Sequence, residues 1–376
     1  MLSLPIGMLV AKRLLGVDNV QVLFDRYGRR PALLGQYASP QTVRIFMYAL
    51  SLCCLAAIAY TVHRIPMVPI FHLLSSQVST LQLQQVRNEI LHIPGGVIYV
   101  KNILALQITP IVSYIAYIFW RRSQHFLDFF WFVGMLLAAV FMLTLDLEKS
   151  PVVLYFIGYL FIEILLKGQC ARRMVLFMGA IALCLVMLAY VYIGRQSGSE
   201  AFLTLNHGLG GRLIFGQVAG TFLSFSLFGH VLPFIGLHSL SHVLSHLFGT
   251  EYAPRAARQI MLVINPIGVA NGQAGVVNSL FIAEAWANFG LWGVLLAPLY
   301  VGFLLEVFFI SLLRLPKTAV LVAIFAYYSV ESGITGGFNN YLYNPQFVLM
   351  LAIFGGVAFV SLVVGRRYAD TPSNVV

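Results

Sequence analysis

Side chains that could act on an anionic substrate are concentrated between Gly194 and Gly290. This stretch contains Arg195, Arg212, Arg255 and Arg258, together with His207, His230, His238, His242 and His246. The planar fork of an arginine suits phosphate oxygens, and a histidine can accept a proton near neutral pH. Residues 194–290 therefore predict a large loop that binds an anion and carries out chemistry on it.

Apolar segments surround this loop and must position it. The chain of 376 residues is 60% hydrophobic and only 10% charged. Its apolar runs of roughly 18 to 24 residues are long enough to cross about 30 Å of hydrocarbon as helices. They lack the alternation of barrel strands. We expect an all-α polytopic membrane protein in which residues 1–376 form a single integral membrane domain.

The apolar runs define eight full crossings. They are residues 43–62, 97–120, 126–145, 151–167, 174–193, 291–313, 318–334 and 347–364. Lysine and arginine at the cytoplasmic ends of the spans orient them, so that residues 63–96 and 194–290 are outer loops. Residues 1–15 are apolar with Lys12 and Arg13 after the apolar part, which predicts the end of a further membrane helix that starts in a longer natural chain.

Eight of the 23 basic residues fall on the outer side in this topology. They are Arg64, Arg87, Lys101, Lys149, Arg195, Arg212, Arg255 and Arg258. This load on the side that is usually poor in positive charge predicts an anionic substrate. The alternative is that these side chains reach lipid head groups or pair with outer acids.

Two of these residues come from outer segments other than the large loop. Arg87 belongs to an amphipathic helix predicted for residues 75–92, and it faces either a substrate or water. Lys149 lies in the turn DLEKS, residues 146–150, at the membrane surface between two spans. Charges at such a position are often functional, although a tight polar turn is the competing explanation.

The histidines predict two different things. His238, His242 and His246 are spaced to share one face of a helix, but no carboxylate accompanies them and the interleaved leucines already explain an interfacial amphipathic helix. His207 stands near Arg212 across a glycine-rich turn, NHGLGGR, where a ligand could approach closely. It is either a general base or a polar surface group.

The end of the large loop carries the strongest pattern. Glycines at 272 and 275 precede a helix that bears Glu284 and Asn288 and then enters the membrane after Gly290. The segment SLFIAEAWANFGLWGVLLAPLYVGFLL, with GGRLIFGQVAGTFLSF and the LEKSPVVL turn, resembles the O-antigen polymerase family, the Wzy-like oligosaccharide repeat unit polymerases. The resemblance extends from about residue 43 through most of the chain and implies a GT-C-like architecture.

The resemblance implies a membrane glycosyltransferase of the bacterial inner membrane whose active site faces the periplasm. It would join oligosaccharide repeat units carried on undecaprenyl pyrophosphate into O-antigen or a related surface polysaccharide. Its partners would be this lipid-linked substrate and the bilayer, and the resemblance allows for a chain-length regulator protein. Two family motifs, an arginine or a histidine followed at a set distance by glycine, do not occur in the outer loops.

The chemistry of such a transfer assigns roles to the candidate residues. The enzyme must hold a pyrophosphate and stabilise the charge that builds on it as it leaves. Glu284 or His207 would accept the proton of the incoming hydroxyl. The expected substrate-binding residues are Arg212, Arg255 and Arg258, supported by Arg87 or Lys149, for the pyrophosphate, and Asn288, Asn339, Asn340, Tyr341 and Tyr343 for sugars. We expect no cofactor and no metal, so activity should survive chelators.

Two other classes of protein stay open at this stage. An O-antigen ligase would use the same lipid donor with a lipid core acceptor. A lipid-linked oligosaccharide flippase would place polar groups in mid-membrane, but only Glu163 and Glu306 are acids well inside the spans. A nucleic-acid partner is not expected, because the topology explains most of the net charge of +10.

Overall fold

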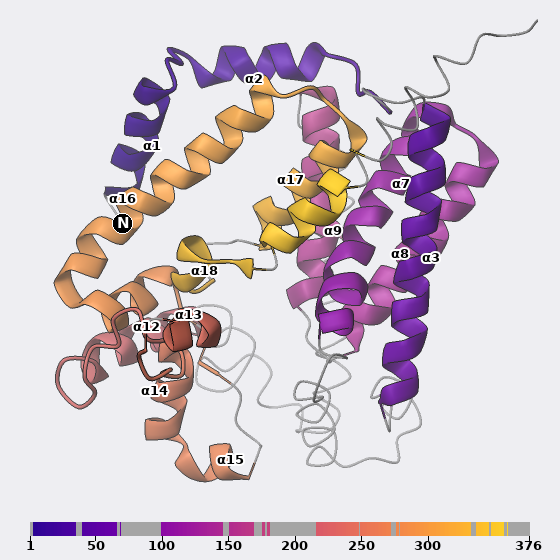
Figure 1. Cartoon of the computed structure of the whole chain (residues 1–376). Coiled ribbons are helices and arrows are strands. Elements are labelled where there is room, and N and C mark those ends of the chain that lie inside the picture. Colours follow the sequence, from indigo (N-terminus) through magenta and orange to yellow (C-terminus); the bar gives the residue numbers. More distant parts are fainter. Residues whose placement is uncertain are drawn as a thin grey trace, which may run out of the picture. The chain divides into compact units, whose positions relative to one another are not determined.

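The computed structural model describes residues 3–34, 40–65, 68, 99–145, 150–168, 175–176, 179–180, 216–247, 249–271, 276–277, 279–331, 336–345, 347–356 and 359. These residues are mostly helical, with two isolated β-bridges among them. They belong to two compact units (Figure 1). One unit comprises Met1–Val20, Leu183–Ser311 and Glu331–Asn344, and the other comprises Gln21–Ala182, Leu312–Val330 and Pro345–Val376.

Among the described residues, four helices are long and apolar enough to cross a membrane, judged by length and composition. They are α3 (Pro40–Arg64), the continuous helix Val100–Ser123, α8 (Phe126–Thr144) and α16 (Phe281–Arg314). They coincide with four of the expected spans, and the helical fold class is confirmed to that extent. The expected spans 151–167 and 318–334 correspond to the helices α9 (Ser150–Lys167) and α17 (Ala319–Glu331). Most of 174–193 lies outside the described residues, and residues 347–356 are helical.

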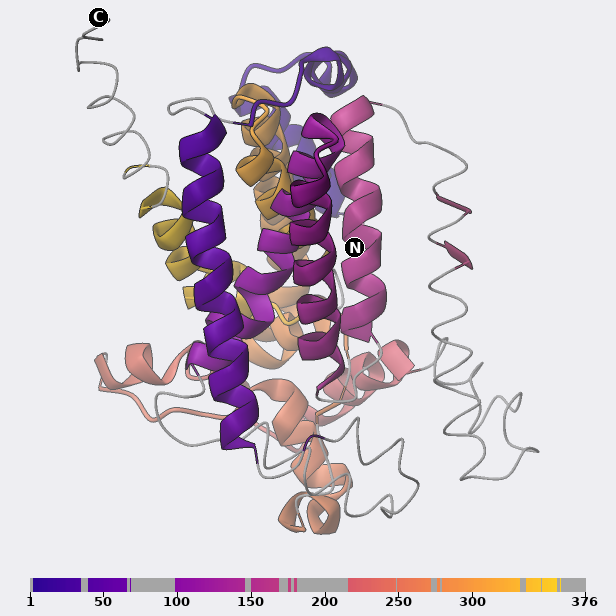
Figure 2. The same ribbon diagram turned by 90° about the vertical axis from the view of Figure 1, so that its right-hand side faces the viewer.

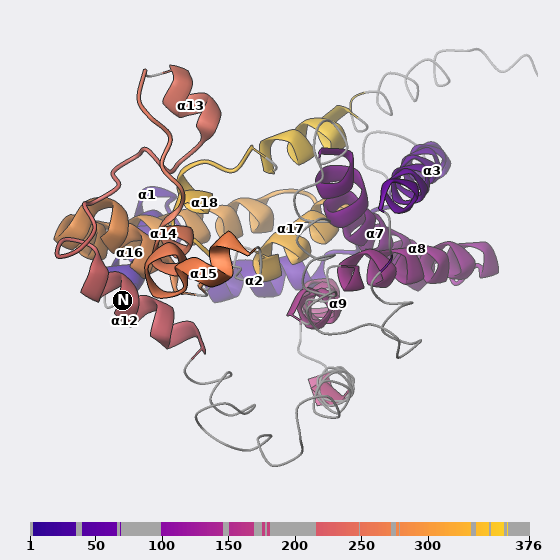
Figure 3. The same cartoon turned by 90° about the horizontal axis from the view of Figure 1, so that it is seen from below.

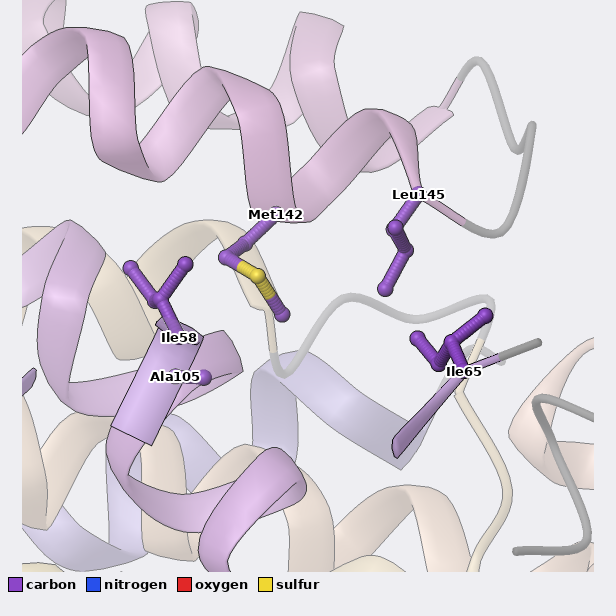
Figure 4. Packing of buried hydrophobic residues seen from close by; sticks show 5 residues of the cluster. All are labelled: Ile58, Ile65, Ala105, Met142 and Leu145. Atoms are coloured by element: carbon purple, nitrogen blue, oxygen red, sulfur yellow. The ribbon is translucent and has the colours of Figure 1, made fainter. Parts of the chain in front are cut away.

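The second unit is built around α7 (Thr109–Ser123), which continues the π-helix η1 (Val100–Ile108). Every residue from Thr109 to Phe119 is buried, because α3, α8 and α9 all pack against α7. The helices lie alongside one another (Figure 2). Ile58, Ile65, Ala105, Met142 and Leu145 form an apolar cluster between α3, η1 and α8 (Figure 4).

A buried lysine fastens the turn between α16 and α17 to two other segments of the same unit. The Lys317 ammonium donates to the carbonyls of Gly28 (3.0 Å), Arg30 (3.1 Å), Tyr27 (3.3 Å) and Leu166 (2.8 Å). Burial, and then the charge of Arg122, lowers the pKa of Lys317 to about 8. The ammonium therefore stays protonated at neutral pH, and it joins the end of α2 (Val20–Arg29) to the end of α9.

Replacing Lys317 with methionine should destabilise the protein. The methionine fills similar space but takes the ammonium away from four carbonyls, of which the Tyr27 carbonyl keeps a second donor, the Arg30 N–H at 3.1 Å. We therefore expect a loss of about 3 kcal/mol in the free energy of unfolding. The measurement is the thermal unfolding midpoint of the purified protein in detergent. Arg29→Met is the matched control, because Arg29 is an exposed residue of α2, the helix whose end Lys317 binds. Equal midpoints for the two variants would show that the hydrogen bonds of Lys317 do not stabilise the protein.

The first unit contains α1 (Ser3–Leu14), α12 (Gly216–Leu227), α13 (His242–Leu247), α14 (Ala256–Ile264), α15 (Pro266–Ala270) and α18 (Asn339–Leu342). It also contains most of α16. Glycines let α1 and α16 approach closely, since a Cβ on Gly7 would overlap the Leu299 carbonyl and one on Gly302 the Leu4 carbonyl. α12 packs against α14, which leads directly into α15 (Figure 3).

Candidate functional site

An arginine and a glutamate, 29 positions apart in the chain, form a two-point ion pair in the first unit. Arg255 stands at the N-terminus of α14, and Glu284 lies in the first turn of α16. Arg255 Nε donates to Glu284 Oε1 and Arg255 Nη2 to Oε2, both at 2.8 Å. Glu284 is buried, whereas the Arg255 side chain is 38% exposed. Arg255, the cationic member of the pair, is therefore the accessible one.

The buried carboxylate has a third donor. The backbone N–H of Asn339, at the start of α18, donates to Glu284 Oε2 at 2.9 Å. Both Glu284 oxygens are therefore engaged, which holds the carboxylate in one orientation. This geometry suits Glu284 to positioning Arg255.

A layer of buried amides and a hydroxyl connects the pair to the rest of the unit. Asn339 Nδ2 donates to the Ser239 carbonyl and hydroxyl oxygens, each at 3.0 Å. Asn288 Nδ2, one turn beyond Glu284 on α16, donates to Asn339 Oδ1 at 2.8 Å. All three side chains are buried. Because each member holds the next, the network fixes α18 against α16.

Asn340, the residue after Asn339, accepts a third hydrogen bond from the Arg255 guanidinium. Its Oδ1 accepts from Arg255 Nη1 at 3.0 Å, and Asn340 itself is exposed. These contacts use three of the five N–H groups of an arginine. Burial lowers the pKa of Arg255, but the hydrogen bond and the charge of Glu284 outweigh burial and raise the pKa above its ordinary value. Arg255 is thus a permanent cation with donors left for a ligand.

Gly337 lies directly against the ion pair. A Cβ at this position would overlap Arg255 Nη2 and Glu284 Oε2. Only the absence of a side chain lets the chain between residues 336 and 339 pass so close to the pair.

A break in α16 shapes the same region. Gly290 has φ 57° and ψ −136°, and the ring of Phe234 stands 3.0 Å from the position its Cβ would occupy. The N–H of Ile235 donates to the Ala287 carbonyl, and the N–H of Gly236 to the Asn288 carbonyl, both at 2.9 Å. The loop thereby binds carbonyls that end the first segment of α16, the segment that carries Glu284 and Asn288.

An apolar groove of about 350 Å³ belongs to the same unit. It is lined by Leu237, Phe289, Trp292, Gly293, Leu296, Ala297, Tyr300, Phe338 and Leu342. Two of these residues adjoin the polar network in sequence, since Phe289 follows Asn288 and Phe338 precedes Asn339. An apolar surface therefore begins beside the anchored guanidinium.

The structure thus brings together five of the residues expected at the site: Arg255, Glu284, Asn288, Asn339 and Asn340. Arg258 lies half-buried in the first turn of α14, and its backbone N–H donates to the Arg255 carbonyl at 2.9 Å. Tyr341 is half-buried next to Asn340, and burial raises the pKa of its hydroxyl. His207, Arg87, Lys149 and Arg212 lie outside the described residues.

The three histidines do not share a helix face, so that expectation is wrong. α13 begins at His242, and His238 lies before it in a turn where its Nδ1 is 3.2 Å from the Glu251 carbonyl. The His238 carbonyl accepts from the Ala253 N–H at 3.1 Å and the Ser239 carbonyl from Asn339 Nδ2 at 3.0 Å, so long-range donors take the carbonyls that an earlier helical turn would use. Within the described part of the chain, no three His, Cys, Asp or Glu residues gather as a metal site would require.

Two members of the site carry no sequence signal that would have identified them. Ser239 sits among alternating leucines and histidines, and only its bonds to Asn339 mark it. Gly337 belongs to a pair of glycines before two asparagines, which predicts a turn but not contact with an ion pair. Comparisons of the chain with protein-family models, curated proteins and solved structures give no match.

Proposed function

We propose that this protein polymerises oligosaccharide repeat units carried on undecaprenyl pyrophosphate at the periplasmic face of the bacterial inner membrane. The architecture that goes with this function is an eight-span, GT-C-like helical membrane enzyme with residues 194–290 outside. The observation that carries the proposal is the Arg255 guanidinium, on a side chain that is 38% exposed, held by Glu284 and Asn340 in the unit that also contains the apolar groove. An anchored cation next to an apolar surface suits a ligand that is both anionic and lipidic.

Arg255 is suited to a pyrophosphate because it is oriented before the ligand arrives. A guanidinium held at two points loses little freedom on binding, and its remaining N–H groups form a fork that matches phosphate oxygens. Arg258, one helical turn further along α14, provides a second cation close in sequence. Arg212, with Arg87 or Lys149, is proposed to supply the remaining positive charge that binds the pyrophosphate.

The reaction transfers a glycan from one lipid to another sugar. A hydroxyl oxygen of the acceptor repeat unit forms a bond to the anomeric carbon of the donor glycan, while the bond from that carbon to the pyrophosphate oxygen breaks. The electron pair leaves with the lipid pyrophosphate, whose growing charge the arginines stabilise. The hydroxyl proton passes to a base, for which we propose His207, because both Glu284 oxygens are already engaged.

Sugar recognition is assigned to the exposed end of the site. Asn340 is exposed and Tyr341 half-buried, and both follow the buried Asn339 in α18. Asn288 and Asn339 are buried and bind one another, so in this proposal they support the site from behind. A chain-length regulator would act on the enzyme from outside this site.

The purified protein should convert undecaprenyl-pyrophosphate repeat units into a ladder of longer glycans on a gel. We expect the ladder to persist in EDTA, because the arginines supply the positive charge for the leaving group. An unchanged substrate band would contradict the polymerase. Loss of the ladder in EDTA with recovery on adding magnesium or manganese would contradict catalysis by arginines without a metal. Addition of a lipid core acceptor separates a ligase, which would yield one transferred product instead of a ladder.

A further inference from the structure

The transfer chemistry leaves the apolar groove of the first unit without a role. Its volume of about 350 Å³ is within the range of small-molecule sites. Among its lining residues, Trp292 and Leu296 are 69% and 55% exposed, and Ala297 and Phe338 are buried. The hydroxyl of Tyr300 donates to the Tyr341 carbonyl at 3.2 Å, so this polar group of the lining is already bonded.

The groove starts within one residue of the ion pair. Gly337 lies against the Arg255 guanidinium, and the next residue, Phe338, lines the groove. Consecutive Cα atoms are about 3.8 Å apart, so the backbone that touches the guanidinium is one residue away from a residue that lines the groove. Prenyl phosphates match this proximity, because their phosphate is bonded to the hydrocarbon chain. In a phospholipid, glycerol separates the phosphate from two chains.

Two small residues of α16 line the groove. Gly293 is required by packing within α16, since a Cβ would overlap the Ala285 carbonyl, and Ala297 presents a single methyl group one turn later. Because bilayer hydrocarbon is as apolar as the groove, occupying it orients the ligand and selects its shape more than it adds affinity.

We propose that the groove holds the first part of the hydrocarbon chain of a prenyl pyrophosphate whose pyrophosphate lies at Arg255. This inference rests on the proposed function and names the residues that recognise the lipid carrier. Leu237, Trp292, Leu296 and Tyr300 line the chain, and Gly293 and Ala297 set the width of the groove. The glycan then extends from the pyrophosphate toward Asn340.

Two neighbouring leucines on α16 provide a matched test. Leu296 lines the groove, whereas Leu295, 50% exposed, does not. Binding of geranylgeranyl pyrophosphate and of dimethylallyl pyrophosphate to the purified protein is measured by calorimetry. Leu296→Trp should weaken binding of the long-chain ligand by about tenfold, because the indole overfills the groove. Leu295→Trp should leave binding of both ligands unchanged, and so should Leu296→Trp for the short-chain ligand.

Several outcomes would overturn the inference. Unchanged long-chain binding in Leu296→Trp, or equal losses in both variants, would show that the groove does not hold the chain. Competition by the two-chained phosphatidic acid as effective as that by the prenyl ligand would show that bulk lipid occupies it. The binding test needs no turnover. Selective long-chain binding without a glycan ladder would contradict the proposed polymerase activity but support chain binding in the groove. A glycan ladder without selective long-chain binding would support the polymerase activity but contradict chain binding in the groove.

Discussion

Replacing Arg255 with lysine should reduce polymer formation by about 10²- to 10³-fold, the range typical of removing one group that stabilises charge in a transition state. Lysine keeps the charge but lacks the planar fork whose separate nitrogens reach both Glu284 oxygens and Asn340. The remaining cation would lose its fixed orientation toward the pyrophosphate. The measurement is the rate of ladder formation by the purified variant at saturating donor.

The control for this variant is another arginine expected on the outer side. Arg64 is exposed at the end of α3, where its guanidinium lies over the Tyr60 ring at 5.3 Å. Arg64→Lys should keep the wild-type rate. Arg255→Lys must also reach the membrane in normal amount and unfold at a normal temperature. A wild-type rate for Arg255→Lys would contradict Arg255 as the anion-binding group.

Glu284→Gln separates two roles for the carboxylate in the same assay. A residue that accepts the proton contributes about 10²- to 10⁴-fold to the rate, and its loss changes the dependence of rate on pH. A glutamine at 284 keeps one acceptor oxygen, which can serve both Arg255 Nη2 and the Asn339 N–H, while its NH2 group takes the place of Oε1 opposite Arg255 Nε. For a positioning residue we therefore expect a much smaller loss and an unchanged pH profile. A rate as low as that of Arg255→Lys, with an altered profile, would identify Glu284 as the base.

The second large effect is expected from Gly337→Ala, a change of one methyl group. The added Cβ would overlap Arg255 Nη2 and Glu284 Oε2, so the two side chains must move apart or α18 must shift. A displacement of about 1 Å at a catalytic group can lower a rate by about 10²-fold, which is the loss we expect. The readout is again the rate of ladder formation, combined with the thermal unfolding midpoint.

Gly134→Ala is the matched control, because no atom lies within 4 Å of the position its Cβ would take on α8. It should leave activity unchanged, since alanine is the better helix former. The double variant Gly337→Ala with Glu284→Asp shortens the carboxylate side chain by one methylene and should recover part of the activity. Normal activity for Gly337→Ala alone would show that the close packing at the ion pair is unimportant.

The sequence alone determined the helical class and the positions of the long apolar helices. Apolar runs are a property of adjacent residues, and a helix satisfies its backbone hydrogen bonds within the same segment. For the same reason the helix that bears Glu284 and Asn288 was predictable, whereas its break at Gly290 was not. Arg255 and Arg258 were candidate anion-binding residues from their side-chain type alone. These features need no knowledge of which segments meet.

Only the tertiary structure decided which polar groups act together. The pairing of Arg255 with Glu284 joins two helix termini, and Asn339 and Asn340 reach the pair from a segment more than 50 residues further on. Neither periodicity nor composition records such contacts. The histidines near 238 show the same limit, because bonds from Ala253 and Asn339 to the His238 and Ser239 carbonyls replace the local helical pattern. Hydropathy acts along the chain, whereas a site depends on long-range hydrogen bonds between specific side chains and backbone groups, which form only once the chain is folded.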